Sequence, residues 1–116
     1  MWIYEQATGA LYHNDTYVGK GYSGTGTGRD NPAAQAEVGV GPIPTGLWKI
    51  GPAYRHWRLG PVVMNLDPVW HNAYGRTLFR IHGDNKKNDA SNGCIILSRS
   101  LRELIAASGD RELTVV

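Results

Sequence analysis

Residues 80–97 read Arg-Ile-His-Gly-Asp-Asn-Lys-Lys-Asn-Asp-Ala-Ser-Asn-Gly-Cys-Ile-Ile-Leu, and the rest of the chain is organised around this stretch. A strand-like run enters it, a polar loop follows, and an apolar run leaves it. The loop is long enough for the chain to fold back, which would bring His82 within hydrogen-bond reach of Cys94, the only cysteine. An imidazole beside a thiol is the minimum set of groups for a cysteine nucleophile and its general base.

The other residues of the stretch suit the same chemistry. A free thiol has a pKa of about 8.5, so a neighbouring imidazolium is needed to hold it as thiolate at neutral pH. Gly93 lets the backbone approach a bound carbonyl, and the amides of Gly93 and Cys94 can then point at the developing oxyanion. Ser91 can bond to the loop backbone or to substrate. Asp84 can orient His82 or cap the turn.

A structural cysteine is the alternative interpretation of Cys94. Free cysteines are among the residues most often buried, and residues 94–97 resemble a core strand. The combination of a histidine, a loop of small residues and Ser-Asn-Gly-Cys in a chain without another thiol favours the catalytic interpretation.

The order of the histidine and the cysteine narrows the enzyme class. Papain-like peptidases place the cysteine first, and caspases place the histidine about 50 residues upstream of it. A histidine shortly before Ser-x-Gly-Cys resembles instead the L,D-transpeptidase (YkuD-like) catalytic domain. Residues 43–48, Ile-Pro-Thr-Gly-Leu-Trp, are similar to the Thr-Pro-x-Gly-x-aromatic segment that such domains carry before a core strand.

More specifically, the chain resembles the small L,D-transpeptidase effectors of type VI secretion. The resemblance runs from Tyr17 to the C-terminus and rests on residues 21–24, 31–32, 41–44, 81–85 and 93–97. One departure concerns Ile95 and Ile96, which follow the cysteine where many L,D-transpeptidases have a polar or basic residue. The resemblance therefore assigns no partner to the substrate carboxylate.

The resemblance implies a mainly β fold, a curved sheet or open barrel with one short C-terminal helix. It also implies attack on the peptide stem of bacterial peptidoglycan, without a cofactor. Cys94 would attack the carbonyl of the third stem residue, meso-diaminopimelate, and expel the terminal D-alanine. His82 would activate the thiol and then protonate the leaving amine, and water or another amine would resolve the thioacyl enzyme. Type VI secretion machinery and a periplasmic immunity protein are the implied partners.

Four residues are candidates for substrate binding. The period-two rule places Arg80 on the same face as His82, where it either meets a substrate carboxylate or remains an exposed strand arginine. Tyr22 and Asn92 lie in segments that resemble the effectors. Trp70 belongs to an aromatic set that can line a groove, although we expect most of its members in the core: Trp48, Tyr54, Trp57, Trp70 and Tyr74.

The bulk composition predicts a single domain over residues 1–116, because this length suits one modest core and is too short for two. Twelve basic residues against 10 acidic residues give a net charge of +2, which is too small for a nucleic-acid binder. The 15 glycines favour a turn-rich β protein.

The N-terminus resembles no secretory signal and no long apolar run suits a membrane, so we expect synthesis in the cytoplasm, delivery by another machine and action in the periplasm of a target bacterium.

The chain pattern predicts one helix and several short strands. The helix runs over residues 99–108 between Ser98 and Gly109, with Leu101, Leu104 and Ile105 as its apolar stripe. Residues 19–24 satisfy G-x-G-x-x-G, but the segment continues as a glycine-rich loop without the helix that a dinucleotide site needs. Asn31 caps a short turn through residue 37, and residues 51–61 form a loop. The expected strands are 2–6, 10–13, 16–18, 47–50, 62–66, 77–82 and 112–116.

Two further function classes compete with the cysteine enzyme. The first is a zinc-dependent cell-wall hydrolase that uses His71, His82, Asp84 and Cys94 as ligands, although their spacing matches no established pattern. The second is a non-catalytic wall-binding module in which the aromatic side chains bind and Cys94 is structural.

Overall fold

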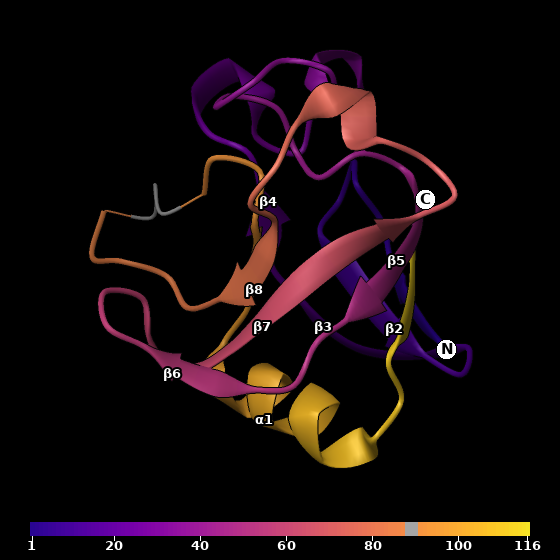
Figure 1. Cartoon of the computed structure of the whole chain (residues 1–116), viewed down its shortest axis with the longest axis vertical. Coiled ribbons are helices and arrows are strands. Elements are labelled where there is room, and N and C mark those ends of the chain that lie inside the picture. The colour runs from indigo at the N-terminus through magenta and orange to yellow at the C-terminus, as the bar shows by residue number, and fades with distance from the viewer. Residues whose placement is uncertain (88–90) are drawn as a thin grey trace.

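The computed structural model describes residues 1–87 and 91–116, and within them the chain forms ten strands and one α-helix (Figure 1). Part of the polar loop between His82 and Cys94, residues 88–90, lies outside this description. Three short 3₁₀ turns occupy Gly26–Gly28, Pro32–Ala34 and Ala73–Gly75. The helix and strands are β1 (Trp2–Tyr4), β2 (Ala10–His13), β3 (Thr16–Lys20), β4 (Tyr22–Ser23), β5 (Gly46–Ile50), β6 (Tyr54–His56), β7 (Gly60–Val69), β8 (Arg80–His82), β9 (Ile95–Ile96), α1 (Arg99–Ser108) and β10 (Glu112–Val115).

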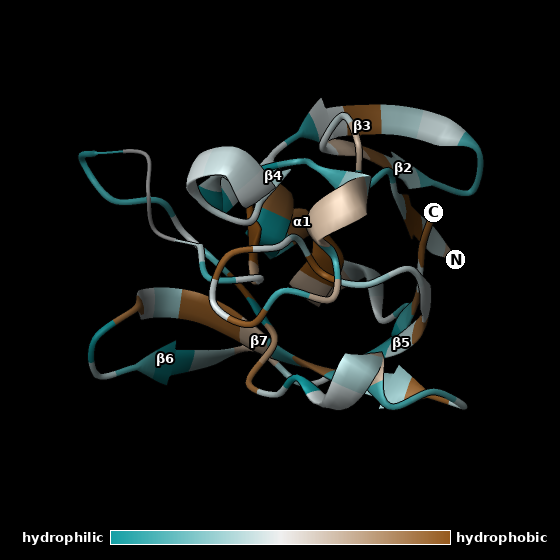
Figure 2. Cartoon of the chain, turned by 90° about the horizontal axis from the view of Figure 1, so that it is seen from above, coloured by the Kyte–Doolittle hydropathy of each residue, from teal (hydrophilic) through white to brown (hydrophobic). Residues whose placement is uncertain are grey.

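The strands form one mixed sheet in the order β3-β2-β1-β10-β5-β7-β8-β9-β4, with β6 paired to β7. The two ends of this order, β3 and β4, are separated in the chain by Gly21 alone, so the sheet has to curl. A Cβ on Gly21 would overlap the Ile96 carbonyl oxygen, which explains why glycine stands at this crossing. Figure 2 shows β2 and β3 on one side of the molecule and β5, β6 and β7 on the other. The expected mainly β fold, a curved and unclosed sheet with one helix, is confirmed.

The core lies on the inner face of the curled sheet. Its largest fully buried side chains include Trp2, Trp48 and Met64, which come from three different strands. The Trp48 ring meets Phe79 edge-to-face, with 5.0 Å between the ring centroids. Burial of each such side chain stabilises the fold by about 1.5–3 kcal/mol. The contact fixes the residue that directly precedes β8, the strand that carries His82.

The α-helix has the predicted limits but a different inner face. Ser98 Oγ accepts a hydrogen bond from the Leu101 amide at 3.3 Å, and Gly109 ends the helix in the left-handed conformation. Ile105 is buried, but Leu104 is 46% exposed, so its place in the predicted apolar stripe was wrong. Arg102 is buried there instead because its guanidinium donates to backbone carbonyls of neighbouring segments. No helix within the described residues is long and apolar enough to cross a membrane.

Several local predictions differ from the structure. Residues 54–56, expected in a loop, form β6 by pairing with β7 as a hairpin. Residues 22–23 form β4 inside the glycine-rich segment, because β9 supplies a partner that local sequence does not reveal. Residues 77–79 are not strand, since Leu78 adopts φ 66 and so breaks the extended backbone.

The predicted core position of the aromatic set was wrong for most of its members. Trp48 is buried, whereas Trp57 and Trp70 are 88% and 91% exposed. Tyr54 and Tyr74 are also exposed. Trp70 and Tyr74 have positive φ, in the segment that follows β7, and Trp57 lies in the turn between β6 and β7. Turn backbone directs these side chains away from the sheet face.

Candidate active site

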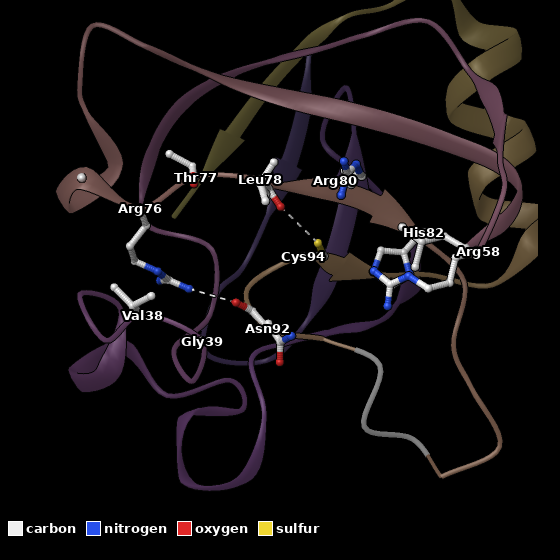
Figure 3. Close-up of a pocket in the computed structure, with 12 residues that line it drawn as sticks. Val38, Gly39, Arg58, Arg76, Thr77, Leu78, Arg80, His82, Asn92 and Cys94 are labelled. Atoms are coloured by element: carbon white, nitrogen blue, oxygen red, sulfur yellow. Dashed lines mark hydrogen bonds between the residues drawn. The ribbon is translucent and has the colours of Figure 1, made fainter.

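The pairing of β8 with β9 brings the histidine and the cysteine to one pocket. The two strands are parallel, with Ile81 opposite Ile95, so Arg80 lies opposite Cys94. Ile81 and Ile95 are both 1% exposed and face the core. Side chains alternate along a strand, so Arg80, His82 and Cys94 share the other face. All three line a pocket of about 380 Å³ (Figure 3). Among the described contacts the Cys94 thiol bonds to Leu78 and the His82 ring to Gly83, so the hydrogen-bond reach between His82 and Cys94 stays a prediction.

His82 is buried and held by its own neighbour. Its Nδ1 lies 2.8 Å from the Gly83 carbonyl oxygen, which can only accept, so the proton resides on Nδ1. Nε2 is then the basic nitrogen. Burial lowers the pKa of His82, the Gly83 hydrogen bond opposes this, and the charges of nearby arginines lower it further. The imidazole is therefore neutral at pH 7 and able to accept a proton.

Cys94 is partly exposed and carries a protonated thiol. Its Sγ donates to the Leu78 carbonyl oxygen at 3.7 Å, the contact drawn in Figure 3. Burial raises the pKa of Cys94, while a backbone hydrogen bond from Arg80 and three arginine charges act in the opposite direction. A neutral thiol and a neutral imidazole differ from the thiolate–imidazolium pair expected from sequence. Burial disfavours both charged forms before substrate is present.

Ser91 organises the loop before the nucleophile. Its side chain is fully buried, and its Oγ accepts from the amides of Gly24 at 2.9 Å and Gly93 at 3.1 Å. The same hydroxyl donates to the Cys94 carbonyl oxygen at 2.6 Å. Of the two uses considered from sequence, the structure shows the bond to the loop backbone. Ser91 is accordingly a positioning residue without access to substrate.

Gly93 is required by a close approach inside the protein. It has φ 125, and a Cβ there would overlap Arg76 Nη2 and lie 3.1 Å from Phe79 Cε1. Its amide donates to Ser91, so the expectation that this amide points at an oxyanion does not fit the structure. Because Ser91 accepts the Gly93 hydrogen, only the Cys94 amide remains as a predicted oxyanion donor.

Asp84 and Tyr22 lie together, outside the Cys94 pocket. Tyr22 Oη donates to Asp84 Oδ1 at 2.6 Å, and the Asn85 amide donates to the same oxygen at 2.8 Å. Asp84 therefore caps the turn after β8, whereas the Gly83 carbonyl orients His82. Tyr22 and Asp84 border a separate shallow hollow near α1.

The other two sequence candidates have different locations. Asn92 lines the pocket with Cys94 and accepts a hydrogen bond through its carbonyl from Arg76 at 3.3 Å (Figure 3). Trp70 borders a different, largely apolar hollow beside Leu47 and Lys49. The structure thus gathers His82, Arg80 and Asn92 around Cys94 and leaves Trp70 elsewhere.

Sequence reasoning missed Arg76, which is 6% exposed and stabilises the loop before Cys94 through a hydrogen bond to the Asn92 backbone. Its guanidinium donates to four carbonyl oxygens, those of Gln35, Gly41, Pro42 and Asn92. Burial lowers the pKa of Arg76, and the nearby Cys94 acts in the opposite direction. Backbone acceptors 16 to 41 residues away leave no signal in the local sequence.

The side chains considered as zinc ligands are held in separate contacts. His71 Nε2 lies 2.9 Å from the Leu47 carbonyl oxygen, and Asp84 accepts from Tyr22. In residues 1–87 and 91–116 no three His, Cys, Asp or Glu side chains gather as a ligand set. The geometry around Cys94 is that of a thiol and a base, and it does not contain the four ligands of the zinc alternative.

No curated protein matches the chain. The family model of the Tlde1 domain matches residues 18–115, which include β8, β9, His82 and Cys94. The chain therefore belongs to the Tlde1 domain family, a family of type VI secretion effectors with L,D-transpeptidase-like activity.

Proposed function

We propose that the protein is a cysteine L,D-transpeptidase and L,D-carboxypeptidase that acts on tetrapeptide stems of peptidoglycan through a thioacyl intermediate. The observation that carries this proposal is the parallel register of β8 and β9, which puts His82 and Cys94 on one face of one pocket. A nucleophile beside a base whose tautomer is fixed by a third group is the arrangement that covalent catalysis requires. Here the third group is the Gly83 carbonyl.

The reaction begins when His82 Nε2 takes the proton from Cys94 Sγ and the sulfur attacks the carbonyl carbon of the third stem residue. The tetrahedral intermediate collapses, the bond from that carbon to the D-alanine nitrogen breaks, and the imidazolium gives its proton to the leaving amine. Water or the amine of a D-amino acid then attacks the thioester, with His82 again as base, and the thiol is restored.

The neutral resting pair suits this sequence of steps. A general base is most useful when it is unprotonated before the reaction and its pKa lies near the operating pH. Binding of substrate displaces water from the pocket, and attack couples loss of the thiol proton to bond formation. The Leu78 carbonyl holds the thiol until then.

We further propose that the protein is an antibacterial toxin delivered by type VI secretion into the periplasm of a target bacterium. Membership in the Tlde1 domain family supports the delivery route and the peptidoglycan substrate. A periplasmic immunity protein that covers the pocket would protect the producing cell. Fusion to a secretory signal should make the protein toxic to a Gram-negative host, whereas the same fusion with Cys94→Ala should be tolerated.

A muropeptide digest tests the reaction. Purified protein should shorten tetrapeptide stems to tripeptides with release of D-alanine, and excess D-methionine should divert part of the product to an exchanged tetrapeptide. Cys94→Ala, which replaces a small side chain with a smaller one, should remain folded and give neither product. Release of the whole stem from the glycan, or cleavage between D-glutamate and the third residue, would assign the protein to another peptidase class.

A further inference from the structure

The pocket around Cys94 has a strong excess of positive charge. Arg58, Arg76 and Arg80 line it, and no Asp or Glu is among the described residues that do so. The Arg76 guanidinium is occupied by four carbonyl oxygens. Within the described part of the chain, the side chains of Arg58 and Arg80 form no ion pair. A pocket with two available guanidinium groups and low-dielectric walls favours an anionic ligand.

The arginines lie on different sides of the thiol. Figure 3 shows Arg76 and Asn92 on one side of Cys94, and His82 with Arg58 on the other. Arg80 lies opposite Cys94 in the strand register. These positions distinguish the two sides of the pocket, because the acyl part and the leaving part of a cleaved peptide extend from the reacting carbonyl in different directions.

The proposed chemistry sets which part of the substrate goes where. His82 gives its proton to the leaving amine, so the departing residue has to lie on the His82 side of the sulfur. The acyl part, which stays on Cys94, then extends toward Asn92. A departing C-terminal amino acid carries its carboxylate one carbon away from the amine. That carboxylate is therefore directed to the part of the pocket where Arg58 lies.

We propose that Arg58 binds the α-carboxylate of the leaving D-amino acid and so restricts cleavage to the C-terminal residue of the stem. The inference rests on the proposed function and adds its specificity-determining residue. In the exchange reaction the same guanidinium receives the carboxylate of the incoming D-amino acid, because acceptor and leaving group occupy one site. A guanidinium fork matches a carboxylate with two parallel hydrogen bonds, and it accounts for a preference for free C-termini.

The backbone around Arg58 is fixed, as a binding residue requires. His56 Nδ1 accepts hydrogen bonds from the amides of Arg58 at 3.1 Å and Leu59 at 3.0 Å. These hydrogen bonds stabilise the turn between β6 and β7 and fix the position of the Arg58 backbone. Arg55, in the same hairpin, is exposed and does not line the Cys94 pocket, which makes it a matched control.

The experiment compares the tetrapeptide stem with the same peptide as its C-terminal amide. Wild-type protein should cleave the acid with a kcat/KM about 10- to 100-fold above that of the amide, as expected for one charged hydrogen-bonded contact. Arg58→Met should lose this preference, mainly through a higher KM for the acid, and Arg58→Lys should retain part of it. Arg55→Met should behave as wild type. An unchanged preference in folded Arg58→Met would overturn the assignment.

A binding measurement separates failure of this inference from failure of the proposed function. Titration of N-acetyl-D-alanine, followed by NMR, should shift the His82 ring signals in wild type and in Arg55→Met. The shifts should be lost in Arg58→Met and with N-acetyl-D-alanine amide. Equal binding by all three proteins, or no binding by any, would refute the carboxylate site whether or not the protein cleaves stems. Binding without cleavage would refute only the proposed reaction.

The pH profile gives a readout that a merely structural role would not move. Burial lowers the pKa of His82, and the charges of Arg102, Arg80 and Arg58 lower it further. Removal of the Arg58 charge should therefore move the acid limb of kcat/KM toward higher pH. Arg55→Met should leave that limb in place.

Discussion

Two buried arginines, Arg76 and Arg102, stabilise different parts of this small protein. Arg76 is 6% exposed and Arg102 is 7% exposed, and each donates to four backbone carbonyl oxygens without a carboxylate partner. Arg102 joins α1 to the start of β7 and lies outside the Cys94 pocket. Arg76 joins residues 35–42 to the loop before Cys94 and lines that pocket. The same chemistry thus supports the fold in one place and the active site in the other.

The largest effect should come from removal of the Arg102 guanidinium, which supports the fold. Arg102→Met leaves the carbonyls of Pro61, Val62 and Leu97 without their buried donor, which should lower the free energy of unfolding by about 3–5 kcal/mol. Urea denaturation measures this loss. The kcat of the protein that remains folded should fall by less than tenfold. A stable Arg102→Met protein with no activity would reverse the distinction between the two arginines.

Removal of the Arg76 guanidinium should lower activity more than it lowers stability. Arg76→Met removes the donor that holds the Asn92 carbonyl, so the loop before Cys94 loses its fixed position. A displacement of about 1 Å at a nucleophile can cost about 100-fold in rate, and we expect kcat/KM to fall by that amount. The free energy of unfolding should fall by about 1–3 kcal/mol. Unimpaired turnover in Arg76→Met would show that the loop before Cys94 keeps its geometry without the Arg76 hydrogen bonds.

Ser91 tests the same distinction on a smaller scale, because its hydroxyl bonds to Gly93 and Cys94 in the nucleophile loop and to Gly24 beside it. Ser91→Ala removes two accepted bonds and one donated bond within and beside that loop. We expect kcat/KM to fall about tenfold and the free energy of unfolding to fall by about 1–2 kcal/mol. Ser23→Ala is the control, since Ser23 Oγ also contacts Gly93 but not Cys94. A larger loss of activity in Ser23→Ala would argue against Ser91 as the main positioning residue.

The smallest predicted effect is a pH dependence that involves the His82 side of the site. Burial holds the pKa of His82 below its ordinary value of about 6.5, so the folded protein binds fewer protons than the unfolded chain in that range. The contribution to stability is fully present above pH 6.5 and is lost as pH falls toward the lower folded pKa. The acid limb of kcat/KM should likewise lie below pH 6.5. NMR titration of His82 checks both, and a pKa above 6.5 would contradict the burial argument.

The features that the sequence could predict are those with a local pattern. The helix at Arg99–Ser108 has its cap residues beside it, and β10 alternates between buried and more exposed side chains. The spacing of His82 and Cys94 around a polar loop predicted that the two side chains come within hydrogen-bond reach, and in the structure both line one pocket. Arg80 reached the same face because strand alternation has a fixed period.

The features that the sequence could not predict depend on distant backbone. Arg58, Arg76 and Arg102 look like ordinary surface arginines, since carbonyl acceptors and pocket walls carry no residue signature. The left-handed backbone of Leu78, which directs its carbonyl to the thiol, also has no glycine to mark it. The role of Asp84 could not be predicted because a turn cap and a histidine partner need the same residue type, and its hydrogen bond with Tyr22 depends on how β4 and β8 lie in the fold.

The most direct test of the central claim is the mass of the protein during turnover. Intact protein mixed briefly with tetrapeptide stem and quenched in acid should gain the mass of the stem without its terminal D-alanine. Peptide mapping should place this adduct on Cys94, and addition of D-methionine should discharge it. Consumption of substrate with no adduct at Cys94, or turnover by folded Cys94→Ala, would contradict the thioacyl mechanism.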